Sequence, residues 1–231
     1  MKIAGLQKMT LLDYPGKVAA TVFLSGCNFR CPYCHNASLV LGRGQAPAIS
    51  QEDFFAFLQT RKGLLDGVCI TGGEPLMQSA LDPFFEKIKA MGFLLKLDTN
   101  GSYPEKLRSL VTGGLVDRVA MDIKNAPAKY AQTAGISSEA IVPRVQESVD
   151  YLLSAPVPYE FRTTVVKSLH TMEDMIAIGQ WIAGAEQYFL QNFEDSGDIL
   201  TPGLQGFTPV EMEAFADALR PYVPAVAVRN P

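Results

Sequence analysis

The stretch Cys27-Asn28-Phe29-Arg30-Cys31-Pro32-Tyr33-Cys34 places three thiols within eight residues, with the spacing C-x3-C-x2-C, directly after an apolar run over residues 19–26. Structural zinc sites and ordinary ferredoxin sites use four protein ligands. The fourth cysteine, Cys69, lies far along the chain in a second apolar run, residues 67–70, where a free cysteine is expected to be a core residue. The local site therefore offers three ligands and leaves one metal position open, which indicates chemistry rather than a purely structural role.

Composition and charge narrow the class of protein. The 231 residues, 48% of them hydrophobic, suit one α/β domain spanning residues 1–231 with a full core. A net charge of −4 without a long charge run argues against nucleic acid as a direct partner. No apolar stretch approaches the roughly 20 residues that span a bilayer, and the N-terminus lacks the apolar core of a signal peptide. Four cysteines are too few for a disulfide scaffold, so a reducing cytoplasm fits better.

Apolar runs alternate with helical patterns along most of the chain. Residues 1–17 form a lead-in that predicts a strand and a turn at Pro15-Gly16. The main strands are expected over residues 18–25, 67–71, 93–98, 115–124, 157–166 and 187–191. Helices are expected to begin at Ser50, between Ser79 and Asp82, near residue 104, near Ile141, at Thr171 and at Thr208. The cysteine loop is expected to continue through Gly42-Arg43-Gly44 to Pro47.

This order of elements predicts a parallel sheet with helices on its outside. Right-handed crossovers wind such a sheet into a partial barrel, and six units are too few for the closed eight-stranded barrel. In such folds chemistry gathers at the C-terminal ends of the strands. The cysteine motif lies at such an end, and so do the turn Gly72-Gly73-Glu74-Pro75 and the residues Asp98 and Asp122.

The cysteine spacing, with an aromatic residue before the last cysteine, resembles that of the radical S-adenosylmethionine (SAM) enzymes. A wider match, Leu12-Asp13-Tyr14-Pro15-Gly16-Lys17 and residues 26–36, is similar to the anaerobic ribonucleoside-triphosphate reductase activating proteins and close in pattern to pyruvate formate-lyase activating enzyme. The resemblance covers the chain from about residue 5 to the helix near residues 210–220. It implies an open (β/α)6 barrel, which agrees with the number of expected strands, and it implies a 4Fe-4S cluster and SAM as cofactors.

The resemblance implies that Cys27, Cys31 and Cys34 bind three irons of the cluster, while SAM chelates the fourth iron through its amino and carboxylate groups. It also implies that Tyr33 contacts the adenine of SAM, through its ring or its backbone. The alternative from the residues alone is a zinc site or a redox-active C-x2-C pair. Zinc would need a fourth ligand, and the adjacent His35 is poorly placed to complete a tetrahedron with its own neighbour.

The turn Gly72-Gly73-Glu74-Pro75 by itself predicts only a tight turn, although glycines let a ligand approach the backbone without a Cβ clash. The resemblance assigns this segment to the methionyl amino group of SAM. Arg162 lies inside an expected strand, where a buried charge needs a partner. It either holds the SAM carboxylate, as the resemblance implies, or forms an internal ion pair with a residue such as Glu160.

Asp98 and Asp122 both follow apolar strand residues, so both are expected near the top of the barrel. Two close carboxylates repel unless a cation intervenes. The pattern is similar to pyruvate formate-lyase activating enzyme, and this resemblance implies a Na+ or K+ ion beside SAM, bound by Asp98, Thr99, Asp122 and the Ala120 carbonyl. The alternative is that Asp98 caps a turn and Asp122 pairs with Lys124, an awkward pairing because residues two apart on a strand lie about 7 Å apart.

The implied activity is that of a radical SAM oxidoreductase. One electron from the reduced cluster cleaves SAM, and the 5′-deoxyadenosyl radical abstracts hydrogen from a glycine of a partner enzyme. The resemblance names anaerobic ribonucleotide reductase as that partner and a flavodoxin, ferredoxin or thioredoxin-type system as the electron donor. The alternatives are activation of pyruvate formate-lyase or another glycyl-radical enzyme, a small-molecule radical SAM enzyme such as a deazaguanine synthase, and a zinc or cluster-binding protein without catalysis.

Overall fold

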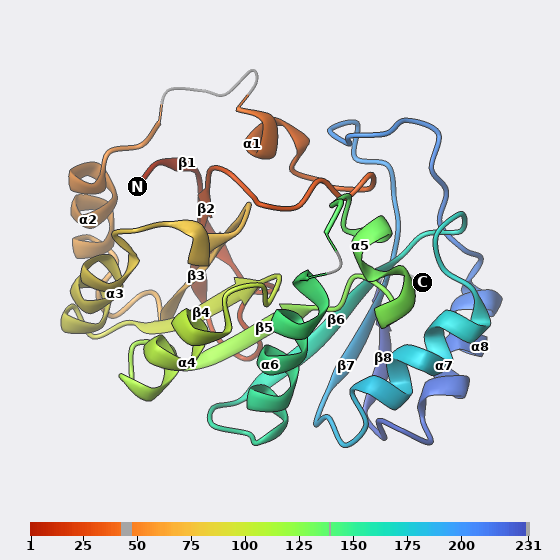
Figure 1. Ribbon diagram of the computed structural model, residues 1–231. Coiled ribbons are helices and arrows are strands. Elements are labelled where there is room, and N and C mark those ends of the chain that lie inside the picture. The colour runs from red at the N-terminus through yellow and green to blue at the C-terminus, as the bar shows by residue number, and fades with distance from the viewer. Residues whose placement is uncertain (43–47, 139, 230–231) are drawn as a thin grey trace.

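The computed structural model describes residues 1–42, 48–138 and 140–229 (Figure 1). The expected continuation of the cysteine loop over residues 43–47 lies outside the described residues.

Across these described residues, one curved sheet of eight strands organises the chain, and each strand lies beside its neighbour in sequence. The strands are β1 (Ile3–Thr10), β2 (Ala19–Leu24), β3 (Gly67–Gly72), β4 (Leu94–Thr99), β5 (Arg118–Asp122), β6 (Tyr159–Val165), β7 (Tyr188–Asn192) and β8 (Val226–Arg229). β1 runs antiparallel to β2, and all later neighbours are parallel. The six expected strands correspond to β2 through β7, and the expected open barrel is confirmed.

Helices cover the outer face of this sheet (Figure 1). They are α1 (Ala37–Leu41), α2 (Gln51–Gln59), α3 (Leu81–Ala90), α4 (Pro104–Thr112), α5 (Tyr130–Thr133), α6 (Ile141–Leu153), α7 (Met172–Trp181) and α8 (Pro209–Leu219), with short 3-10 turns η1 (Pro75–Met77) and η2 (Pro127–Lys129). The expected start signals are confirmed. The Ser50 hydroxyl accepts the Asp53 N–H at the start of α2, and Thr208 forms a capping box with Glu211 at the start of α8.

Alternation along the strands separates an apolar outer layer from a charged interior. In β4, Leu95 and Leu97 are fully buried and belong to the apolar core, whereas Asp98 lines the interior cavity described below. In β5, Val119 and Met121 belong to the core in the same way, and Asp122 lines the cavity. Because successive side chains of a strand point to opposite faces, Asp98 and Asp122 face the same interior space, opposite to the apolar core residues beside them.

The structure differs from the expected elements at several places. Helices α1 and α5 and strand β8 are additional, and β8 is a four-residue run after Pro224 that is too short to give a clear strand pattern. The strand expected over residues 115–124 covers only Arg118–Asp122. Its start is delayed because the Asp117 carboxylate accepts the Leu95 N–H at 2.7 Å and the Lys89 amine at 2.6 Å, so Asp117 is held at the start of β4 instead.

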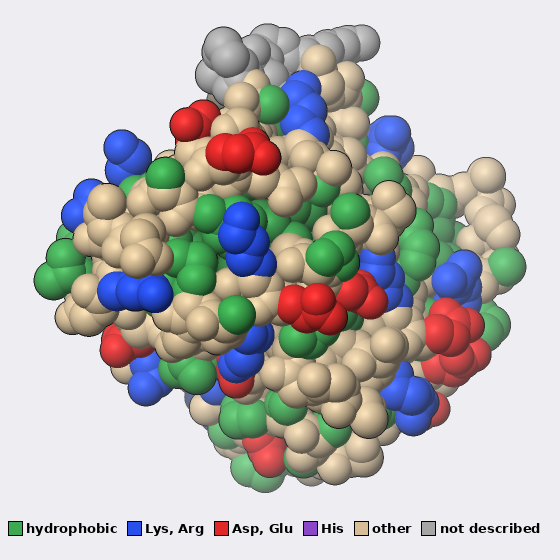
Figure 2. All heavy atoms as spheres, turned by 90° about the vertical axis from the view of Figure 1, so that its left-hand side faces the viewer, with side chains coloured by type: hydrophobic (Ala, Val, Ile, Leu, Met, Phe, Trp, Pro, Cys, Tyr) green, Lys and Arg blue, Asp and Glu red, His purple; other side chains and the backbone are tan. Residues whose placement is uncertain are grey.

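The surface over α2 and α3 mixes acidic, basic and apolar side chains, without an extended patch of one charge sign on the face that Figure 2 presents. Within residues 1–42, 48–138 and 140–229, no helix combines the length and the apolar character that crossing a bilayer requires.

Candidate active site at the carboxyl ends of the strands

A cavity of about 410 Å³ lies at the carboxyl ends of the strands, below the cysteine loop. It collects nearly all residues that the sequence singled out. Those that line it are Cys27, Cys31, Tyr33, Cys34, Gly72, Gly73, Asp98, Thr99, Asp122 and Arg162. Glu74 and Ala120 are predicted residues that do not line it. Segments from the four strands β3 to β6 and the cysteine loop therefore meet at one place.

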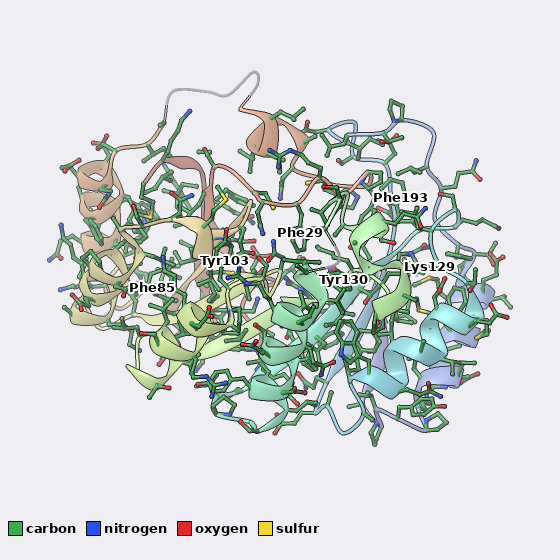
Figure 3. All side chains as sticks on the ribbon, viewed as in Figure 1. Phe29, Phe85, Tyr103, Lys129, Tyr130 and Phe193 are labelled. Carbon is green, nitrogen blue, oxygen red and sulfur yellow. The ribbon has the colours of Figure 1, made fainter. Side chains whose placement is uncertain are left out.

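The cysteine loop is tied to the sheet by main-chain contacts at both sides. At its start, the Gly26 carbonyl accepts the Glu74 N–H at 2.8 Å. Farther along, the Arg30 N–H donates to the Ala134 carbonyl at 2.9 Å, and the Phe29 ring packs edge-on against Tyr130 of α5, as Figure 3 shows. The loop is thus held between the β3 turn and α5, so its three thiols have fixed places relative to the strand ends.

The three thiols have environments that suit a metal cluster. Cys31 is buried, while Cys27 and Cys34 are half-buried. Burial raises the pKa of Cys27 to about 12 and that of Cys31 to about 11, so the thiols are protonated until a metal replaces the protons. Among the described residues, no three His, Cys, Asp or Glu side chains converge on one point as ligands of a single ion do. Three closely spaced thiols with one metal position left open match the ligand set of a cluster site, whereas a structural zinc site uses four protein ligands.

His35, the fourth ligand of the zinc alternative, stacks its ring on Phe193 at the end of β7, with ring centroids 5.3 Å apart. Tyr33 is almost fully buried, with its ring edge-on to that of His170 at 6.5 Å. Its contact with adenine, implied by the resemblance, stays a prediction.

The two glycines of the turn after β3 are required by the protein's own backbone. Gly72 has a φ of +118°, and a Cβ there would lie 2.4 Å from the main-chain N and O of Leu24. A Cβ on Gly73 would lie 1.7 Å from the Gly26 carbonyl oxygen. The glycines thus allow β3 to pass directly beside the start of the cysteine loop. Their assigned contact with the methionyl amino group of SAM stays a prediction.

Glu74 is fully buried and ties this turn to the end of β4. Its carboxylate accepts the Asn100 N–H at 2.7 Å, the Thr99 hydroxyl at 2.8 Å and the Leu76 N–H at 3.0 Å. Burial raises the pKa of Glu74 to about 7, although these hydrogen bonds lower it in part. The Glu74 side chain therefore holds the turn after β3 against the end of β4 without lining the cavity itself. Its assigned role toward SAM stays a prediction.

A chain of alternating charges crosses the cavity floor from β4 to β6. Lys96 pairs with Asp98, whose other oxygen lies 3.1 Å from the Arg162 guanidinium. Arg162 also lies 3.1 Å from Asp122, and Lys124 lies 2.8 Å from the second oxygen of Asp122. Register explains this meeting, because Asp122 is the direct neighbour of Arg162 on the adjacent strand. All four carboxylate oxygens have a basic partner.

This arrangement shows the ion pairs that the sequence had left open, while the contact of Arg162 with the SAM carboxylate stays a prediction. Arg162 does form an internal ion pair, but with Asp98 and Asp122 rather than with Glu160, which lies 3.0 Å from Arg118. The Asp122–Lys124 pairing, expected to be awkward, is formed, because Lys124 lies past the end of β5.

Burial alone would raise the pKa values of both carboxylates. The charges of Arg162 and Lys96 outweigh burial at Asp98 and lower its pKa, and the charges of Lys124 and Arg162 lower the pKa of Asp122 to about 2. A Na+ or K+ ion at Asp98, Thr99 and Asp122 stays a prediction. Such an ion would have to displace one of the basic side chains that are paired with the two carboxylates.

Several lining residues were not predicted as part of the site. Lys124 follows Asp122 by two positions, Asn36 follows Cys34 by two, and Asn100 directly follows Thr99. Their nearness in sequence to predicted residues was the available signal. For Asp13 the available signal was weaker, namely its place in the matched segment before β2. Asp13 lines the cavity, and its carboxylate accepts the Thr21 hydroxyl at 2.5 Å. Cys69 is fully buried, as expected of a core cysteine, with its sulfur 3.6 Å from Asp98.

Comparison with known proteins identifies the family to which the chain belongs. Residues 21–182 match the model of the radical SAM superfamily. The chain is 32% identical over 195 residues to a putative glycyl-radical enzyme activating enzyme of Methanocaldococcus jannaschii, covering 83% of this chain and 80% of the relative. It is 31% identical to the pyruvate formate-lyase-activating enzyme of Listeria monocytogenes, over 61% of this chain and 60% of that protein.

The fold is similar to that of Streptococcus suis SuiB in its SAM-bound crystal structure, with a TM-score of 0.68 and 13% identity over 91% of this chain. The chain spans about half the length of SuiB, 52% in that structure. The protein belongs to the radical SAM superfamily. Its cofactors are accordingly a 4Fe-4S cluster and SAM, and the three thiols with the polar cavity beneath them suit this pair chemically.

Replacing Cys27, Cys31 or Cys34 with alanine should each remove the cluster, because the local site has no spare thiol. Iron and sulfide analysis after anaerobic reconstitution measures this loss. Cys69→Ala is the matched control and should keep full iron content. A full cluster in any of the three loop variants, or loss of the cluster from the control, would contradict the assignment.

Arg162→Met should lower the free energy of unfolding by about 3 kcal/mol at pH 7, because it leaves two buried carboxylates without their shared cation. Without Arg162, burial and mutual repulsion push the pKa values of Asp98 and Asp122 up toward or above the value of about 3.9 in the unfolded chain. The destabilisation should then be largest above these raised pKa values and should shrink as pH falls from there toward about 2, the pKa of Asp122 when Arg162 is present. Denaturant titrations at several pH values measure this trend.

The control is Arg220→Met, which removes an exposed arginine paired with Glu213 at the surface. It should change stability by less than about 0.5 kcal/mol at every pH. An Arg162→Met variant as stable as this control would show that the charge chain is not coupled through Arg162.

Proposed function

We propose that the chain is an activating enzyme of a glycyl-radical enzyme, with anaerobic ribonucleoside-triphosphate reductase as its partner. The observation that carries the proposal is the single cavity in which three loop thiols face Asp98, Asp122 and Arg162. The named function of the M. jannaschii relative, which aligns with most of the chain, supports the activase class. The single continuous sheet supports a chain that works as one domain over residues 1–231.

Residues on two sides of the cavity have different roles. Cys27, Cys31 and Cys34 hold the cluster from the loop side. Arg162, already paired with Asp98 and Asp122, and Lys124, already paired with Asp122, present positive charge toward the carboxylate of SAM from the strand side. When bound, the reduced cluster and SAM supply a one-electron cleavage that yields a 5′-deoxyadenosyl radical able to abstract hydrogen from glycine. The protein positions the reactants and excludes water.

A macromolecular substrate fits the open barrel. In the part of the chain that the structure describes, β1 and β8 each pair with one neighbour, so the sheet does not close there. A lateral gap of this kind can admit a loop of a partner enzyme to the cavity. A flavodoxin, ferredoxin or thioredoxin-type protein would supply the electron, and the cytoplasm is the compartment that suits oxygen-sensitive thiol ligation.

A second candidate partner is pyruvate formate-lyase. The 31% identity to the Listeria activating enzyme favours it, although that match covers 61% of this chain. Activation of either candidate needs the same chemistry in the cavity. The two candidates would differ in the surface by which the partner enzyme docks on this chain.

The deciding experiment mixes the reconstituted, reduced protein and SAM with each purified partner and records EPR spectra. A glycyl radical signal should form on anaerobic ribonucleotide reductase, together with stoichiometric 5′-deoxyadenosine. A partner with its radical-bearing glycine replaced by alanine is the control. A signal only on pyruvate formate-lyase would move the proposal to the second candidate. A large acceleration of SAM cleavage by a small metabolite, with no radical on either enzyme, would contradict activase function.

A further inference from the structure

The side chain of Asn100 lies between the end of β4 and the first cysteine of the loop. Asn100 is 6% exposed and lines the cavity. Its Nδ2 donates to the Asn28 Oδ1 at 2.9 Å and lies 3.9 Å from the Cys27 sulfur, within hydrogen-bond range for sulfur. Asn100 directly follows β4 and is separated from Cys27 by 73 positions in the sequence. Its contact with the cysteine is therefore a product of the fold.

The orientation of the Asn100 amide is fixed by its neighbours. Its Oδ1 accepts two hydrogen bonds from Ser102, one from the main-chain N–H at 3.0 Å and one from the hydroxyl at 2.6 Å. An amide nitrogen could not accept these donors, so the oxygen must face Ser102 and Nδ2 must face the cysteine loop. The Asn28 side chain closes the ring by donating from its own Nδ2 to the Ser102 hydroxyl at 2.9 Å.

The backbone beneath this amide is also held in place. The Asn100 N–H donates to the buried Glu74 carboxylate at 2.7 Å. The next residue, Gly101, donates its N–H to the Thr99 hydroxyl at 3.1 Å and accepts the Ser148 hydroxyl at 2.7 Å. An amide held by such contacts cannot turn away from Cys27 without breaking several buried hydrogen bonds, each of which is costly to leave unmade.

Cys27 thus has two N–H donors directed at its sulfur. The first is the main-chain N–H of Phe29, at 3.3 Å, which comes from the loop itself. The second is Asn100, which comes from the sheet. By contrast, the Cys31 thiol lies 3.7 Å from the Ala134 carbonyl, an acceptor rather than a donor.

We infer that Asn100 is a positioning residue that holds the Cys27 thiolate and raises the reduction potential of the cluster. Hydrogen bonds to ligand sulfurs are one of the factors that set cluster potentials. Reduction adds negative charge to the cluster and its thiolates, and an N–H donor stabilises that charge. The inference rests on the cluster of the superfamily and does not depend on which enzyme is activated, so it can fail while the proposed function holds.

The test is a redox titration of the reconstituted full chain, following the EPR signal of the reduced cluster. Asn100→Ala should keep its iron and sulfide content, but its midpoint potential should shift to a more negative value. A smaller fraction of the cluster should then be reduced at any fixed potential. Asn36→Ala is the matched control, because Asn36 also lines the cavity beside a ligand cysteine, and its side chain, which the substitution removes, donates to the Gly72 carbonyl at 3.2 Å rather than to sulfur.

Asn100→Asp provides a second variant of nearly the same shape. It keeps an acceptor for Ser102, but it replaces the donor with an oxygen, so its potential should shift further in the negative direction. A potential equal to that of the wild type in both Asn100 variants would overturn the inference, and so would an equal shift in Asn36→Ala. Loss of the cluster from both Asn100 variants would also overturn it, because Asn100 would then be needed to assemble the site rather than to tune it.

Discussion

The site depends on the close approach of two main-chain segments where β2 and β3 end. The strands are paired in register up to Leu24 and Gly72, and the pairing continues past the strands through the Gly73 N–H to the Leu24 carbonyl at 2.9 Å and the Glu74 N–H to the Gly26 carbonyl at 2.8 Å. This contact leaves no room for a Cβ at position 73. It fixes where the cysteine loop begins relative to the sheet.

The rest of the cavity follows from that approach. Because Glu74 is held beside Gly26, its carboxylate reaches the end of β4 and orients Thr99 and Asn100. Asn100 in turn reaches back to the cysteine loop. The three segments form a closed circuit of hydrogen bonds, and movement of one would strain the other two.

The charged interior is the second feature that sets this barrel apart from an apolar core. Burying isolated charges costs several kcal/mol each, so the interior alternates basic and acidic groups along Lys96, Asp98, Arg162, Asp122 and Lys124. Three of these groups are positive and two are negative. Two of the positive groups, Arg162 and Lys124, line the cavity, which suits a ligand that carries a carboxylate.

The sequence allowed the strands β2 to β7, the order of the fold and most cavity residues to be predicted, because period-two apolar runs and strand-end motifs are local signals. The partners of Arg162 could not be predicted, since they depend on the register between β5 and β6. The backbone contact that requires Gly72 and Gly73 was also hidden, because it joins distant segments. Strand β8 was missed because four residues give too little periodicity, and the burial of Glu74 could not be predicted because it is a tertiary property.

The central claim is that the main-chain contact between Gly26 and Gly73 holds the cysteine loop over the cavity. The most direct test compares Gly73→Ala with Gly5→Ala, whose added Cβ would lie an ordinary 3.5 Å from the Phe23 ring. Gly73→Ala should lower the free energy of unfolding by about 3 kcal/mol and should reduce the iron bound per chain after anaerobic reconstitution. Gly5→Ala should leave both nearly unchanged. Wild-type stability and a full complement of iron in Gly73→Ala would contradict the claim.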